Sequence, residues 1–314
     1  MNILFMGTPI FALPSLARLV ESRHTVAGVF SQPDRPVGRS HTPTPPPVKR
    51  FAAIHHLPVY SPEKIRTDDV RETMAQLGPD VIVVVAYGKI LPPWMLEMPR
   101  YGAINVHASL LPKYRGAAPI QWAVANGEIH TGVTTLQMDA GLDTGNILLQ
   151  RAVAILPEDN AQTLHDKLAG LGAELLMESL EGIEEGSLHP RTQDDSQATL
   201  APILKKEDGK LDWGWPANRI HNCVRGLNPW PGTFTTFRGG YLRVWRTGKP
   251  TEAGDMETES PPGTLIHRPH SALQVRTGGG ACLSLLEVQP AGHRRMEGID
   301  FLNGFRITPG EQLV

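Results

Sequence analysis

The sequence predicts an α/β protein with two domains: a Rossmann-like, doubly wound N-terminal domain built on a mostly parallel sheet, and a smaller C-terminal β-barrel. Three observations lead to this prediction. The chain opens with an apolar strand, a Gly-Thr-Pro turn and an apolar-periodic helix over 10–20. The run over 81–86 is apolar and mostly β-branched, which is typical of a strand buried on both faces of a parallel sheet. After Thr233, short strands alternate with glycine turns, as in small barrels.

The length and charge of the chain fit this division. A chain of 314 residues is long for one domain and sufficient for two. We place the domains at 1–188 and 209–314, joined by a polar linker over 189–208. The net charge is −2, which argues against a protein that binds nucleic acid by charge alone. Residues 209–314 nevertheless contain 12 lysines and arginines against 9 acids, a weak hint of a polyanionic partner.

In the N-terminal domain, period-2 and period-3.6 patterns alternate along the chain. The opening turn lacks the G-x-G-x-x-G fingerprint, which removes the main support for dinucleotide binding. A hairpin is expected around Asp143. We expect strands over 3–6, 24–30, 57–60, 81–86, 131–138 and 145–155, and helices over 10–20, 48–55, 68–77, 119–126 and 162–182.

Prolines dominate one connection of this domain. Between Ser31 and Arg50 there are six prolines, four basic residues and one acid. Such a stretch cannot form a long helix or a central strand. It is either an ordered, exposed connection or a mobile basic loop that contacts phosphates.

The stretch from Ala103 to Pro112 holds the candidate chemistry. Side chains alternate along a strand, so Asn105, His107 and Ser109 are expected on one face, near the end of the strand where open α/β sheets bind ligands. An amide can donate a hydrogen bond to an oxyanion, and an imidazole moves protons near neutral pH.

A carboxylate can complete this set. Asp143 lies in the glycine-flanked stretch 141–145, outside any expected regular element, and a carboxylate beside an imidazole fixes its tautomer. The simpler alternatives are a structural Asn–His pair and a turn aspartate.

The chain resembles the formyltransferase family that uses 10-formyltetrahydrofolate. The resemblance lies in Asn105-x-His107 followed by Ser-Leu-Leu-Pro at 109–112, and in Gly-Leu-Asp-Thr-Gly at 141–145. The likeness covers nearly the whole chain. The C-terminal part, with Asn-Pro-Trp-Pro-Gly at 228–232 and Phe-Leu-Asn-Gly at 301–304, is most similar to members that formylate the methionine carried by initiator tRNA, rather than to the shorter purine-pathway relatives. The barrel is then expected to be of the oligonucleotide-binding (OB) type and to bind tRNA.

The resemblance assigns roles to particular residues. Asn105, His107 and Asp143 would be catalytic. The folate pocket would be formed by residues at the ends of two strands: Ser109, Leu110, Leu111, Pro112, Tyr87 and Gly88. The tRNA acceptor stem would be contacted from the proline-rich loop by Arg35, Arg39 and Lys49. Ser-His-Thr stands at 40–42, where the family usually has further lysines, so the tRNA contacts of this loop can differ.

For several residues a structural role competes with the functional one. Tyr87 can simply pack in the core. Arg115 can contact an anionic group of a substrate or be an exposed structural arginine. Trp213 and Trp230 can stack on nucleotides or anchor the barrel core.

The expected reaction is transfer of the formyl group from 10-formyltetrahydrofolate to the α-amino group of methionyl-initiator tRNA. Asn105 would stabilise the oxyanion, His107 would move the amine proton, and Asp143 would orient His107 or accept the proton through water. Alternatives are formylation of a sugar nucleotide or glycinamide ribotide, hydrolysis of the donor to formate, and a noncatalytic tRNA- or folate-binding protein.

The remaining expectations come from what the sequence lacks. Cys223 and Cys282 are far apart and lack the Cys/His spacing of a zinc site, so we expect no metal and a reducing compartment. No run approaches the ~20 apolar residues of a membrane span, and the first residues enter a strand without a signal-peptide pattern. We therefore expect a cytoplasmic monomer whose partners are tRNA and folate, with no membrane contact.

Overall fold

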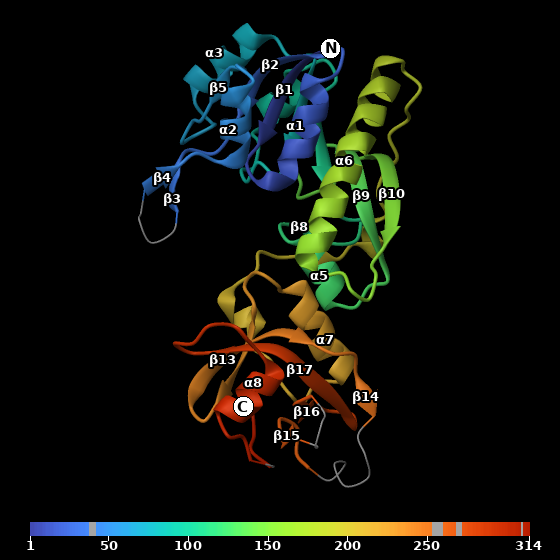
Figure 1. Cartoon of the computed structure of the whole chain (residues 1–314). Helices are drawn as coiled ribbons and strands as arrows, with labels where there is room; N and C mark the ends of the chain where they lie inside the picture. Colours follow the sequence, from blue (N-terminus) through green and yellow to red (C-terminus); the bar gives the residue numbers. More distant parts are fainter. Residues whose placement is uncertain (38–41, 253–259, 268–271, 309) are drawn as a thin grey trace. The chain divides into compact units, whose positions relative to one another are not determined.

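The computed structural model describes residues 1–37, 42–252, 260–267, 272–308 and 310–314 (Figure 1). The chain forms two compact units. The first comprises Met1–Pro119, His130–Ala154 and His165–Ala201, and the second comprises Ile120–Ile129, Ile155–Leu164 and Pro202–Val314.

The first unit is built on a seven-stranded sheet in the order β10-β9-β7-β6-β1-β2-β5. Strands β7, β6, β1, β2 and β5 are parallel, and the hairpin β9–β10 adds antiparallel to β7. The Rossmann-like, mostly parallel sheet is thereby confirmed. The strands are β1 (Asn2–Gly7), β2 (Thr25–Phe30), β5 (Val59–Tyr60), β6 (Val81–Val85), β7 (Ala103–His107), β9 (His130–Gln137) and β10 (Ile147–Ala154).

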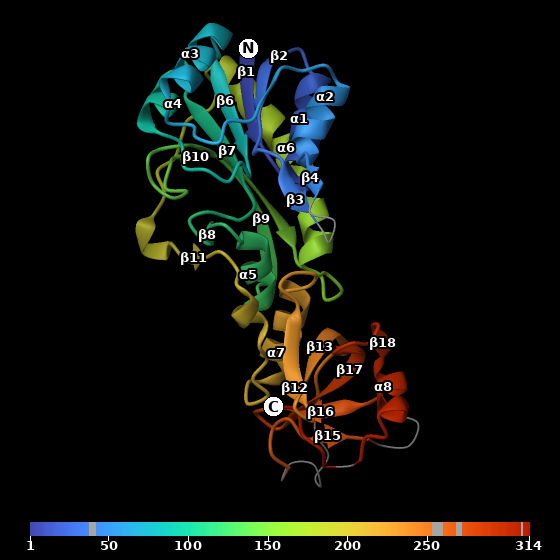
Figure 2. The ribbon, with the colours of Figure 1, turned by 90° about the vertical axis from the view of Figure 1, so that its left-hand side faces the viewer.

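Helices cover both faces of this sheet (Figure 2). Helices α3 (Asp68–Leu77) and α4 (Pro93–Glu97) lie on one face. On the other lie α1 (Leu13–Val20), which follows a 3-10 turn over Ile10–Ala12, α2 (Pro47–Ile54) and α6 (Ala161–Glu184). Strand alternation sends Leu4 and Met6 of β1 into a core with Val70 and Met74 of α3. The expected helix over 68–77 is confirmed at both ends, whereas α4 was not anticipated.

The same alternation decides where β7 presents its polar residues. Val106 faces α6, because a Cβ on Gly172 of that helix would lie 2.9 Å from a Val106 methyl carbon. Asn105 and His107 therefore point to the opposite face of the sheet.

Two stretches that were expected to be irregular contain short strand pairs. In the proline-rich connection, β3 (Arg35–Val37) pairs antiparallel with β4 (Thr42–Thr44), so part of this connection is regular structure. In the stretch expected as a linker, β11 (Leu200–Ala201) pairs in parallel with β8 (Arg115–Gly116), after a 3-10 turn over Asp195–Gln197. The second pairing ties this stretch to the site described below.

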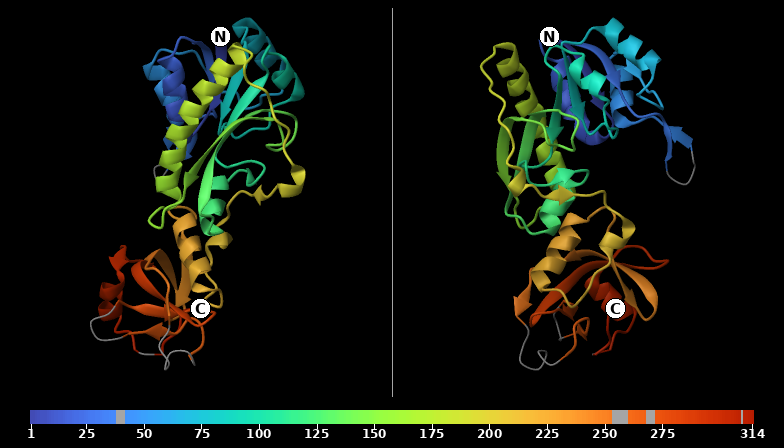
Figure 3. Two further views of the ribbon diagram at one scale, coloured as in Figure 1. Left: turned by 90° about the vertical axis from the view of Figure 1, so that its right-hand side faces the viewer. Right: turned by 180° about the vertical axis from the view of Figure 1, so that it is seen from behind.

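The second unit is a curled antiparallel sheet in the order β12-β13-β17-β16-β15, with β14 and β18 paired to β17 (Figure 3). The last residues close the curl, since Val314 exchanges backbone hydrogen bonds with Thr236 of β12 while Leu313 donates to Gly263 beside β15. The strands are β12 (Thr233–Phe237), β13 (Gly240–Thr247), β14 (Thr251–Glu252), β15 (Leu265–Ile266), β16 (Gln274–Arg276), β17 (Ala281–Pro290) and β18 (Met296–Glu297).

Helices complete this unit and its core. The helical elements are α5 (Pro119–Ala125), a 3-10 turn over Lys206–Gly209, α7 (Ala217–Gly226) and α8 (Gly298–Gly304). All of α5 except Pro119 belongs to this unit. Ile220 and Val224 of α7 and Phe301 of α8 are buried among the inward residues of the strands. Trp213 is 4 % exposed and donates to Thr235 Oγ1, so it is a buried anchor. The expected barrel-like unit is confirmed, although α8 was not anticipated.

No helix in the described part of the chain is long and apolar enough to cross a membrane.

Candidate active site

Asn105 and His107 lie side by side at the end of β7, as the alternation predicted. The strand ends at His107, so the pattern does not continue to Ser109, and the expectation that all three share a strand face was wrong in this detail. Ser109 is fully buried and its hydroxyl donates to Lys113 O at 2.6 Å. Its role is to hold the turn that follows the strand.

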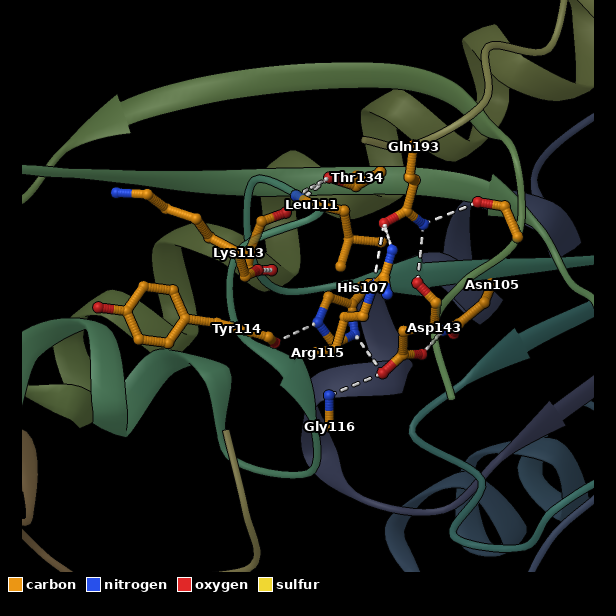
Figure 4. Close-up of polar contacts among 12 residues, drawn as sticks. Asn105, His107, Leu111, Lys113, Tyr114, Arg115, Gly116, Thr134, Asp143 and Gln193 are labelled. Atoms are coloured by element: carbon orange, nitrogen blue, oxygen red, sulfur yellow. Dashed lines mark hydrogen bonds and ion pairs between the residues drawn. The ribbon is translucent and has the colours of Figure 1, made fainter. Parts of the chain in front are cut away.

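The loop after β9 brings Asp143 to the same point, although 38 residues separate it from Asn105 (Figure 4). Asp143 Oδ1 accepts from Asn105 Nδ2 at 3.3 Å, and Oδ2 accepts from the backbone N–H of Gly116 at 2.8 Å. Oδ2 also lies 3.7 Å from His107 Nδ1. The three residues expected to be catalytic therefore form one cluster.

The hydrogen bond of His107 to the backbone determines its tautomer. Nε2 lies 2.9 Å from Tyr114 O. Because a carbonyl can only accept, Nε2 must carry a proton, and in the neutral ring Nδ1 is the nitrogen with the free electron pair. Nδ1 is also the nitrogen that faces the Asp143 carboxylate. A proton taken up at Nδ1 would thus be stabilised by Asp143 at once.

The β8–β11 pair supports the cluster from one side. Gly116 has φ +120°, and a Cβ there would meet Ala201 O at 2.7 Å, so only glycine lets β11 pass this closely. The close pairing fixes the N–H of Gly116 that donates to Asp143.

Arg115 is 7 % exposed, so it is not the exposed structural arginine weighed as one alternative. Its guanidinium binds the side chain of Gln193, and one nitrogen also contacts Asp195. Gln193 in turn donates to the Asp143 loop (Figure 4). The sequence patterns missed Gln193, because it lies in a polar stretch without periodicity and 50 residues from Asp143.

The turn after β7, where the folate residues Leu110, Leu111 and Pro112 were expected, is tied to β9. Leu111 N donates to Thr134 Oγ1 at 3.1 Å, and that hydroxyl donates to Ser109 O at 2.7 Å. Leu111 is buried, whereas Leu110 and Pro112 are partly exposed.

The second expected folate segment follows β6. Tyr87 is 1 % exposed and belongs to the core on the α3–α4 face, so its side chain packs as the simpler alternative proposed. Burial raises the pKa of Tyr87 to about 12. Its carbonyl accepts from Thr8 Oγ1 and from Gln32 Nε2, both at 3.0 Å, next to Gly88 at φ +86°. Three strand ends are joined here.

Two of the three residues expected to bind tRNA lie in the described part of the chain. Arg35 is exposed on β3, while Lys49 on α2 is paired with Asp34 at 2.7 Å. Arg39 lies outside the described residues. Among the residues that the structure describes, no group of three or more His, Cys, Asp or Glu side chains is arranged to hold a metal ion.

Transfer of an acyl group to an amine can be catalysed by three groups: an amide donor, an imidazole with a free electron pair, and a carboxylate that can stabilise the protonated imidazole. The fold and this cluster fit a group transferase.

Comparison with known proteins specifies the family. The formyl transferase profile matches residues 1–180, and the profile of the formyl transferase C-terminal domain matches residues 203–306. The chain belongs to the formyl transferase family. It is 51 % identical to a methionyl-tRNA formyltransferase of Solibacter usitatus, over 100 % of this chain and 98 % of that one, and 48 % identical to one of Geobacter metallireducens, with the same coverage.

Solved structures agree on the fold at lower identity. An N-formyltransferase from Helicobacter canadensis, in complex with folinic acid and dTDP-3-aminofucose, is 17 % identical with a TM-score of 0.65, over 92 % of this chain and 99 % of that one. HypX from Aquifex aeolicus in complex with tetrahydrofolic acid is 18 % identical with a TM-score of 0.61, over 99 % of this chain and 48 % of that one.

Proposed function

We propose that this protein transfers the formyl group of 10-formyltetrahydrofolate to the α-amino group of methionyl-initiator tRNA. The single observation that carries the proposal is the convergence of Asn105, His107 and Asp143 at the end of β7 in a chain related over its full length to methionyl-tRNA formyltransferases. The folate-derived donor is supported by the family and by neighbours solved with folates.

The reaction proceeds in three steps. The amine nitrogen forms a bond to the formyl carbon, the carbonyl oxygen becomes an oxyanion, and the bond from that carbon to folate N10 breaks as N10 gains a proton. Asn105 Nδ2 uses one hydrogen on Asp143, and its second hydrogen is suited to the oxyanion. Removing such a donor typically costs about 3–4 kcal/mol of barrier.

His107 moves the proton through Nδ1. Its Nε2–H is bonded to Tyr114 O, so Nδ1 takes the proton that the amine loses and delivers it to folate N10. Asp143, with Oδ2 at 3.7 Å, stabilises the imidazole while it carries that proton. In the second role weighed for it, Asp143 would accept the amine proton itself, through a water.

The donor would lie against the turn that follows β7 and against the end of β6. Leu110, Pro112 and Gly88 supply its walls in this proposal, whereas Ser109, Leu111 and Tyr87 shape the pocket from behind, since their side chains are buried. The hydrogen bonds of Leu111 to Thr134 and of Tyr87 to Thr8 and Gln32 make these walls rigid.

For the tRNA we propose two contact regions. The first is the proline-rich segment over 31–50. It includes Arg35 on β3, Arg39, and Lys49 on α2, which would have to leave Asp34 to bind a phosphate. The second is the domain over 209–314, which carries cations on aromatic rings. The guanidinium carbon of Arg295 lies 3.9 Å from the ring centre of Trp245, and that of Arg243 lies 5.2 Å from it. Such groups suit phosphates and bases.

Acceptor choice tests the proposal. Labelled formyl transfer would be measured to methionyl initiator tRNA, to methionyl elongator tRNA, and to two small amines, a dTDP-amino sugar and glycinamide ribotide. The proposal expects transfer to the initiator at least 100-fold faster than to the others. Faster transfer to either small amine would keep the site and overturn the proposed substrate.

A further inference from the structure

Gln193 connects the segment after α6 to the loop that carries Asp143. Its side chain is 8 % exposed. Its Nε2 donates to Asp143 O and to Gly145 O, each at 2.7 Å. One amide group therefore holds the backbone on both sides of Thr144 (Figure 4).

The orientation of this carboxamide is unambiguous. Its oxygen faces the guanidinium of Arg115, which can only donate, with Nε at 3.1 Å and Nη2 at 2.7 Å. Its nitrogen faces two backbone carbonyls, which can only accept. All four hydrogen-bonding positions of the Gln193 amide are thus used, and rotating the amide by 180° would break every one of them.

Arg115 is a firm support for Gln193. The guanidinium is buried, and its backbone belongs to β8, whose neighbour Gly116 donates to the Asp143 carboxylate. Both residues thus hold the same loop. Arg115 acts through Gln193 on the backbone of the loop, and Gly116 bonds the Asp143 side chain directly.

The Asp143 loop needs such support. Asp143 has φ +54°, a left-handed conformation that is unfavourable for residues with a Cβ. The residues just before it are exposed, and Leu142 is 59 % exposed, so packing contributes little there. Asp139 bonds Gly141 and Thr144 within the loop, whereas Gln193 and Gly116 attach the loop to β8 and hold the carboxylate against Asn105 and His107.

We propose that Gln193, held by Arg115, is a positioning residue for the reaction: it fixes the Asp143 loop so that the carboxylate lies beside His107 Nδ1 and Asn105 Nδ2. This inference rests on the proposed function. It assigns a role in catalysis to a residue in the stretch that the sequence marks as a linker.

Gln193→Glu is the sharpest test, because it keeps the shape of the side chain and its acceptor for Arg115 but places oxygen where two carbonyls need a donor. We expect kcat to fall 10- to 100-fold, the scale of a misplacement of about 1 Å, while KM for the donor and for the tRNA stays within threefold. Gln197→Glu is the matched control. It is the same substitution four residues later, on an exposed side chain that donates to Asp194, and its kcat should stay within twofold of the parent protein.

A double variant separates positioning from general damage. If Gln193 acts through Asp143, then Gln193→Glu combined with Asp143→Asn should be no slower than Asp143→Asn alone, within threefold. Losses that multiply, or a Gln193→Glu variant with kcat within twofold of the parent protein, would overturn the role.

If Gln193→Glu does not fold, as judged by its circular dichroism and thermal transition, Arg115→Lys replaces it. Lysine keeps the charge but cannot donate two hydrogen bonds in the fixed fork geometry of arginine, so we expect a 3- to 10-fold loss of kcat with the same absence of multiplication in the Asp143→Asn background. A multiplied loss, or a kcat within twofold of the parent protein, would again overturn the role. The acceptor that the parent protein formylates tests the proposed function. The ratio of variant rate to parent rate on that same acceptor tests the role of Gln193. The proposed function and the positioning role can therefore fail separately.

Discussion

Replacing Asp143 by asparagine removes one negative charge from the site and leaves its shape almost unchanged. In the parent protein, Asp143 Oδ1 accepts from Asn105 Nδ2, and Oδ2 accepts from Gly116 N and faces His107 Nδ1. An amide has only one accepting oxygen, so one of these donors would face an NH₂ group.

The distance sets the expected size of the effect. At 3.7 Å, with an effective dielectric constant of about 20, the Coulomb attraction between a carboxylate and an imidazolium is roughly 4 kcal/mol, before the cost of desolvating the two charges is subtracted. The side chains of His107 and Asp143 are 7 % and 14 % exposed, so solvent screens the pair only in part. Loss of that stabilisation, if fully expressed in the transition state, corresponds to a rate about 10³-fold lower.

The assay is single-turnover transfer of labelled formyl to methionyl initiator tRNA, with saturating protein. Asp139→Asn is the control, because Asp139 stabilises the same loop through one oxygen, Oδ1, which accepts from Gly141 N and Thr144 Oγ1 and which an asparagine retains. We expect a 10²- to 10³-fold loss for Asp143→Asn and less than a threefold loss for Asp139→Asn. A loss below threefold at Asp143, or equal losses at both positions, would refute the reasoning.

Three further predictions follow from other parts of the chain. Burial, with Arg225 and Lys249 nearby, lowers the pKa of His221 to about 4, so the unfolded chain binds the proton more tightly and stability should fall by roughly 2 kcal/mol as pH drops from 6.5 to 4. Urea unfolding followed by tryptophan fluorescence should show this loss in the parent protein and not in His221→Gln, and an equal loss in both would contradict it. Tyr87→Phe should leave the KM for the donor within twofold and the thermal transition unchanged or higher, because the buried hydroxyl has no partner among the described residues. A clear rise in that KM would mean that the hydroxyl contacts the donor. Arg243→Ala should raise the KM for tRNA about 3- to 10-fold and weaken its salt dependence, with single-turnover kcat unchanged. A change in kcat alone would place Arg243 outside the tRNA surface.

Much of the fold follows from periodicity, and the reason is visible at particular elements. The β-branched run over 81–85 is buried on both faces, as expected for a central strand of a parallel sheet, which is what its pattern predicts. The helix over 68–77 begins with acidic residues and ends at Gly78 in the left-handed conformation, so both of its ends are marked in the sequence.

The candidate site was predicted only where its residues share a local pattern. Asn105 and His107 lie two apart on one strand, and alternation alone places them together. The glycine-flanked stretch made Asp143 a candidate, but only the family resemblance favoured a catalytic role over that of a turn aspartate, because nothing local shows that its loop folds back onto β7. Arg115 and Gln193 meet across 78 residues, and Ser109 leaves the strand because a turn to Lys113 intervenes. Such long-range contacts leave no period in the chain.

The most direct measurement of the central claim is a mass balance on the formyl group. Purified protein would be incubated with formyl-labelled 10-formyltetrahydrofolate and methionyl initiator tRNA, and label would be counted on the methionine nitrogen and in free formate. We predict that each donor consumed yields one formyl group on the amine, with formate below a few per cent, and that Asn105→Ala slows this transfer about 100-fold or more. Label recovered as formate, or transfer unaffected by the loss of Asn105, would contradict the account.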